Sequence, residues 1–131
     1  MTQDEKALLL KDLCMRAPYS VKCSCYEGRL TATLTGVKSD TELYFHELDW
    51  KEDDGIIEIE FCKPYLFPMS SMTKEQEKYL MSLMEKISIP FWGEVLTPSI
   101  EYFDYLNKNH FDYRDLIGKR LAIDCSNLNI Y

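Results

Sequence analysis

The densest group of potentially reactive side chains lies between residues 110 and 114, where His110, Asp112 and Arg114 alternate along the chain. An imidazole, a carboxylate and a guanidinium close together could recognise a small ligand, because a planar guanidinium matches a carboxylate or phosphate group. The same residues also suit structural roles. Asp112 could cap a helix, His110 could end the preceding one, and Arg114 could pair with Asp115 or another acid. Both interpretations stay open from the sequence.

The second candidate surface is acidic. Nine Asp or Glu residues and one Lys lie between positions 40 and 60, whereas the other 110 residues carry 13 acids and 14 bases. The net charge of −7 is therefore local, and it disfavours direct nucleic-acid binding. We predict a hairpin here, in which Glu52, Asp53 and Asp54 form a turn that could dock on the basic surface of a protein partner. The alternative is a solvated face that discourages edge-to-edge pairing.

Large aromatic residues offer possible anchors, because Trp is enriched among the residues that dominate protein interfaces. Trp50, Phe91 and Trp92 could serve in this way, although a core position is the favoured expectation for Phe91. An assembly protein would form a defined oligomer built on Trp50 or Trp92.

Several kinds of site are not indicated. The five glycines form no phosphate-binding loop, and the sequence contains no nucleophile elbow. The five cysteines include a Cys23-x-Cys25 pair but match no disulfide framework or common zinc spacing, so we predict reduced thiols, no metal and no cofactor. No apolar run reaches the roughly 20 residues of a membrane span, and the N-terminus lacks signal-peptide features. A cytoplasmic protein without membrane association is expected.

The surrounding pattern predicts one α+β domain over residues 1–131, an antiparallel sheet of about four to five strands with three main helices packed on one face. The expected helices are 3–15, 73–87 and 97–110, and the expected strands are 19–26, 29–37, 42–50, 57–61 and 121–123. Residues 63–69, with two prolines, are expected to cross as a stiff non-strand segment. Residues 89–93 are expected to be a connector, and residues 112–118 a short helix.

The helix at 97–110 is expected to organise the fold. Thr97 would cap it, with Pro98 at its first position. Ile100, Phe103 and Leu106 follow at helical spacing, with His110 continuing the same face. An apolar stripe of this kind predicts that the helix docks at the centre of the molecule.

Several longer phrases resemble a family of small uncharacterised proteins found in Bacteroides-type gut bacteria and in their phages and mobile elements. The phrases cover about half of the chain, at residues 8–18, 64–73, 107–117 and 118–124. Asp115 departs from the pattern, since members often have Gly there. The resemblance implies an accessory, phage-linked or mobile-element-linked cytosolic protein, and it carries over no activity and no functional residue.

The sequence therefore favours a non-enzymatic accessory protein that binds another protein, through the acidic hairpin at 40–60. One alternative is a small enzyme or small-ligand-binding protein with its site near residues 110–114. A further alternative is a structural or assembly protein.

Overall fold

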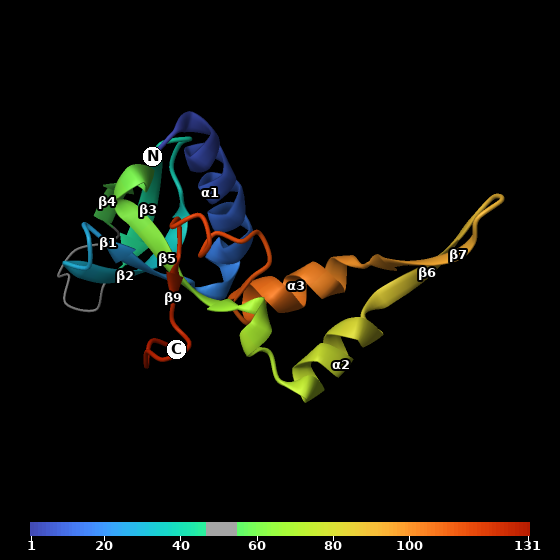
Figure 1. The fold of residues 1–131 in the computed structure, drawn as a ribbon. Coiled ribbons are helices and arrows are strands. Elements are labelled where there is room, and N and C mark those ends of the chain that lie inside the picture. The colour runs from blue at the N-terminus through green and yellow to red at the C-terminus, as the bar shows by residue number, and fades with distance from the viewer. Residues whose placement is uncertain (47–54) are drawn as a thin grey trace.

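The computed structural model describes residues 1–46 and 55–131, and these form a body from which a long arm projects (Figure 1). The body contains a seven-stranded sheet in the order β4-β3-β2-β1-β5-β8, with β9 also paired to β5. Its elements are α1 (Gln3–Arg16), β1 (Lys22–Cys25), β2 (Leu30–Val37), β3 (Glu42–His46), β4 (Gly55–Glu58), β5 (Cys62–Pro68), β8 (Phe111–Asp112) and β9 (Ile123–Asp124). Short 3-10 helices cover Ala17–Tyr19, Ile59–Phe61 and Met69–Ser71.

Helix α1 begins as the sequence predicts. The Thr2 hydroxyl accepts a hydrogen bond from the backbone N–H of Glu5 at 3.1 Å, and the Glu5 carboxylate accepts one from the N–H of Thr2 at 2.9 Å. This reciprocal capping box satisfies two of the N–H groups that a helix start leaves free. Leu9 and Leu13 then face the sheet and are fully buried.

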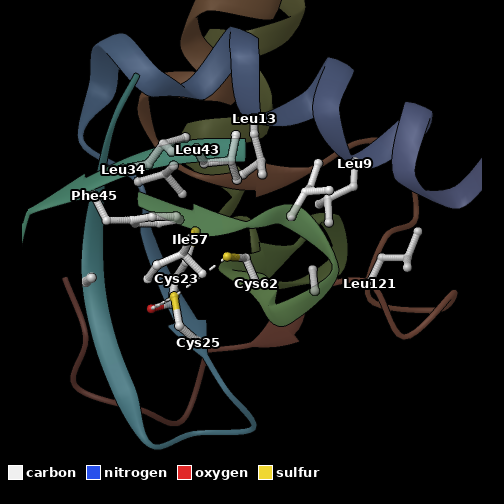
Figure 2. Close-up of a cluster of buried hydrophobic side chains, with 14 of the residues drawn as sticks. Leu9, Leu13, Cys23, Cys25, Leu34, Leu43, Phe45, Ile57, Cys62 and Leu121 are labelled. Carbon is white, nitrogen blue, oxygen red and sulfur yellow. Dashed lines mark hydrogen bonds between the residues drawn. The ribbon is translucent and has the colours of Figure 1, made fainter. Parts of the chain in front are cut away.

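The core lies between α1 and the sheet (Figure 2). Strands β1 and β2 form the predicted hairpin, with Cys23 opposite Ala32, and the inward positions of β2 include Leu34. Leu34 packs with Leu43 and Phe45 of β3 in one buried cluster. Alternation of apolar and polar residues therefore located this half of the sheet correctly.

Strand β5 corrects one expectation. Despite Pro64 and Pro68, this segment is a strand that pairs antiparallel with β1 and parallel with β8 and β9. The backbone N–H of Tyr26 donates a hydrogen bond to the carbonyl of Phe61. Every second residue of an antiparallel strand bonds the same neighbour, so Phe61 and Lys63 face β1 and Pro64 faces away from it. The missing N–H of Pro64 therefore removes no bond to β1. The sheet is therefore mixed rather than antiparallel.

The arm comprises residues 73–108 and corrects a second expectation. Helix α2 (Lys74–Ser82) has the predicted Thr73–Gln76 capping box but ends five residues before Ile87. Strands β6 (Met84–Ile89) and β7 (Gly93–Pro98) follow as an antiparallel ribbon, and α3 (Ile100–Lys108) returns to the body. Residues 90–92 are the turn of this ribbon rather than a connector.

Helix α3 does not lie at the centre of the fold. Ser99 caps it in place of Thr97, and Ile100 and Phe103 remain exposed, while Leu106 is fully buried. Helices α2 and α3 instead pack on each other through Tyr79 and Tyr105, whose ring centroids are 5.0 Å apart. Of the three α-helices in residues 1–46 and 55–131, α1 covers the large sheet, whereas α2 and α3 belong to a smaller second core.

The α+β class is confirmed, whereas the strand count and the wholly antiparallel arrangement are not. Residues 113–120 form successive turns rather than the expected short helix. No helix in the described part of the chain is long and apolar enough to span a bilayer.

Candidate interaction surface

The ribbon (Met84–Pro98) is the most exposed apolar feature of the structure and extends away from the body (Figure 1). None of its residues is fully buried. Its tip, defined as Phe91 and Trp92, is open to solvent, with Phe91 fully exposed and Trp92 81% exposed. Both the core position expected for Phe91 and the connector expected for residues 89–93 are therefore wrong.

The tip is held by a tight turn. The backbone N–H of Trp92 donates to the carbonyl of Ile89 at 3.1 Å, which places Pro90 and Phe91 at the two central positions. Phe91 has φ +71°, the left-handed conformation that the third residue of a type II turn requires and that Gly usually supplies. An aromatic residue held in this conformation stores strain, and such strain gathers at functional segments.

The two faces of the ribbon differ. In β6, Ile87 and Ile89 alternate with Lys86 and Ser88, and the register places Val95 opposite Ile87. One face of the ribbon therefore carries Ile87, Ile89 and Val95 toward the tip, while the pair Glu85 and Thr97 makes the same face polar near the body. A two-stranded ribbon without cover is marginally stable in water, so this face is suited to contact with another surface.

A groove of about 730 Å³ opens where the ribbon meets the body, and we call it the arm-base groove. Its apolar lining includes Met69, Pro98, Tyr102, Phe103, Tyr113 and Ile117. Asp112 and Asp115 add carboxylates to the lining. The volume lies within the roughly 300–1,000 Å³ of sites that enclose small ligands or side chains.

Asp112 fills the structural role rather than pointing freely into this groove. Its two carboxylate oxygens accept hydrogen bonds from the backbone N–H groups of Leu116 and Ile117, both at 2.9 Å. The residue is buried, and the two bonds hold the turns at 113–120 in place. This accounts for Asp112 without a ligand.

Arg114 pairs with a residue far away in the sequence. Its guanidinium donates to Asp12 of α1 at 2.8 Å, and the other oxygen of Asp12 accepts from Arg16 at 2.7 Å. Asp12 and Arg16 are fully buried, and Arg16 also donates to the carbonyl of Phe111 at 2.6 Å. The carboxylate of Asp12 therefore ties α1 to the segment after α3, and Asp115 pairs instead with Lys119 at 3.8 Å.

His110 is buried against the end of the chain. Its ring stacks on that of Tyr131, with centroids 3.9 Å apart and planes 12° from parallel. Tyr131 donates its hydroxyl to the carbonyl of Tyr65 at 2.9 Å. Burial, followed by the charges of Arg16 and Lys22, lowers the pKa of His110 to about 4. The structure thus brings His110, Asp112 and Arg114 into one region, where each has a structural partner.

The acidic hairpin can be followed only in part. Trp50, Glu52, Asp53 and Asp54 lie outside the described residues. In the described strands, Glu42 of β3 lies directly opposite Glu58 of β4, a like-charge pair that weakens a sheet. The Oε2 atom of Glu60 lies 3.6 Å from the Nζ atom of Lys6, which is an ion pair.

Three buried thiols, two on β1 and one on β5, lie near one another in the core (Figure 2). Cys25 lies opposite Cys62 in the register, with their sulfur atoms 3.8 Å apart, and Cys23 is buried nearby. The hydrogen bond to Cys25 and burial raise the pKa of the Cys62 thiol, and burial raises that of Cys23. No group of three or more His, Cys, Asp or Glu side chains in residues 1–46 and 55–131 is placed to hold a metal ion.

No protein-family model, curated protein or solved structure matches this chain. The resemblance to small phage-linked and mobile-element-linked proteins therefore stays a prediction, and function has to be argued from the geometry. Of the residues singled out in the sequence, Trp92 lies on the most exposed apolar surface. Phe91 lies beside it, although the sequence favours a core position for this residue over a role as an interface anchor. The alternation Ile87-Ser-Ile89 followed by Pro90 and Gly93 is a hairpin pattern that could have located it at a turn.

Proposed function

We propose that this chain is a non-enzymatic accessory protein that acts by binding another protein chain, and that its contact surface is the arm. The observation that carries the proposal is the tip, where Phe91 and Trp92 stand exposed at the end of a projecting ribbon. Exposed apolar surface of this kind marks interaction sites, and buried aromatic anchors supply most of the energy of an interface.

The cluster at 110–114 supports a catalytic or ligand-binding role less well. Asp112 caps a turn, Arg114 pairs with Asp12, and the His110 ring is stacked and buried. Groups engaged in this way contribute to stability. The acidic hairpin stays a second proposed contact, through Glu52, Asp53 and Asp54, for a partner with a basic surface. The phage-linked or mobile-element-linked context is likewise proposed on the resemblance alone.

Affinity capture with matched baits tests the proposal. The baits are the wild type, a tip variant F91S/W92S, a hairpin variant E52Q/D53N/D54N, and a control M15S, which removes an exposed apolar side chain from α1. We expect a partner that the wild type and M15S retain and the tip variant loses. A partner lost only by the hairpin variant, and weakened by salt, would move the contact to the acidic surface. Identical capture by all baits would refute a role for the arm.

A further inference from the structure

The apolar surface of the arm is left uncovered by the other described residues. Ile87 and Ile89 of the ribbon, the two tip residues and Ile100 at the start of α3 are all exposed. A monomeric protein rarely exposes so large an apolar patch without a partner for it.

We propose that a second copy of this chain covers it. Two arms lie antiparallel about a twofold axis, and the tip of each inserts into the arm-base groove of the other. The inference rests on the proposed function and names its partner.

The length of the ribbon fits this arrangement. The arm-base groove includes Pro98, the last residue of β7, and Tyr102 and Phe103 in the first turn of α3, so it begins where the ribbon ends. A six-residue strand spans roughly 20 Å. Two ribbons of equal length that overlap completely in antiparallel order therefore place each tip at the base of the other. A contact of this type uses the same patch twice and closes as a dimer.

The sizes of tip and groove also agree. Covering an aromatic side chain removes roughly 150–250 Å² of surface, so one tip accounts for roughly 300–500 Å² and two tips for twice that. Two tips alone stay below the roughly 1,200–2,000 Å² of a stable interface, so the overlapping faces of the two ribbons have to supply the rest. The groove volume of about 730 Å³ is suited to two aromatic side chains. Asp115 at the groove could accept the N–H of the Trp92 indole.

Charge favours a copy of the chain over two other occupants. Residues 73–108 carry four Lys and six acids, a charge of −2, and the rest of the chain carries the remaining −5. Contact through the arms therefore keeps the acidic bodies apart. Phosphate backbones and anionic lipid surfaces attract basic surfaces, which the arm does not provide.

Sedimentation and light scattering over about 1 µM to 1 mM test the proposal directly. We expect the 15.4 kDa chain to form a concentration-dependent dimer. The tip variant F91S/W92S and a groove variant F103E should each weaken dimerisation by about 1,000-fold, because a dimer of either variant loses both tip–groove contacts and one dominant contact is worth about 30-fold. Glu is a good helix former, so F103E keeps α3, and M15S should dimerise as the wild type does.

Mixing the two variants distinguishes insertion into the groove from simple pairing of ribbons. A tip variant keeps its groove and a groove variant keeps its tip, so a mixed dimer retains one of the two contacts. We expect the mixture to associate more strongly than either variant alone. In a W50F background Trp92 is the single Trp, and its emission should shift to shorter wavelength as the dimer forms.

A chain that stays monomeric at about 1 mM would overturn the proposal, as would a dimer that F91S/W92S and F103E leave unchanged. A monomer whose Trp92 emission shifts only with neutral phosphatidylcholine vesicles would also overturn it, in favour of a membrane surface. If self-association fails while arm-dependent capture of a different protein persists, the proposed function stands and only the identity of the partner is wrong. Failure of both removes the proposed function as well.

Discussion

Protonation of His110 should destabilise the fold. Its imidazole is buried against the Tyr131 ring and lies near the positive charges of Arg16 and Lys22. Burial and these charges lower its pKa from 6.5 to about 4. The unfolded chain therefore binds a proton near pH 6.5 that the folded chain binds only near pH 4. The stabilisation is fully present above pH 6.5 and is lost as the pH falls through this window.

The size of the effect follows from the two pKa values. A difference of one pKa unit corresponds to about 1.4 kcal/mol, so the free energy of unfolding should fall by about 2 kcal/mol between pH 7 and pH 5. The loss should approach about 3 kcal/mol below pH 4. His110→Asn removes the titrating group, and Asn accepts the left-handed backbone at φ +62°.

Urea unfolding followed by circular dichroism at pH 7, 6 and 5 measures the effect. We expect the free energy of unfolding of the wild type to fall between pH 7 and pH 5 by about 2 kcal/mol more than that of the Asn variant. Leu106→Ala, which lowers stability without removing a titrating group, should keep the wild-type slope. Parallel slopes for the wild type and the Asn variant would refute the assignment of the low pKa to His110.

Three further results are expected. Asp12→Asn should cost about 3–5 kcal/mol in the free energy of unfolding, because it leaves the buried Arg16 guanidinium unpaired; urea unfolding at pH 7 measures it. Leu106→Ala should cost about 2–5 kcal/mol by the same assay, whereas Ile100→Ala, at 77% exposure, should stay within about 0.5 kcal/mol. Iodoacetamide should modify the exposed Cys14 quickly in the folded chain and the four buried thiols only after unfolding, as mass spectrometry of the labelled protein would show.

Local chemistry was sufficient to predict some elements. Thr2 with Glu5 and Thr73 with Gln76 form the predicted capping boxes, because this bonding involves only residues three apart. The β1–β2 hairpin follows from strict alternation along β2. Of the two roles that the sequence leaves open for Asp112, the structure shows the capping one, on a turn rather than on the expected short helix.

Other elements depend on partners that are distant in the sequence. The partner of Arg114 is Asp12, 102 positions away, and no local pattern points to it. Strand β5 contains two prolines, so its own sequence argues against a strand. It is nevertheless paired, because β1, β8 and β9 supply backbone hydrogen-bonding groups to it. The position of His110 similarly requires Tyr131, whose ring covers it.

Ser99 marks the point at which the arm departs from the helix predicted for residues 73–87. Leu83, Met84 and Ile87 fit a helical stripe, so extending α2 to Ile87 was reasonable on spacing alone. The Ser99 hydroxyl accepts the N–H of Tyr102 at 3.2 Å and donates to the carbonyl of Leu83, so it caps the start of α3 and engages the C-cap residue of α2. Ser99 is buried, and its two bonds hold the start of α3 beside the end of α2, where the paired strands of the ribbon begin and end. Ser99→Ala should therefore loosen the base of the arm while leaving the body folded, which hydrogen exchange in β6 and β7 compared with β1 and β2 would reveal.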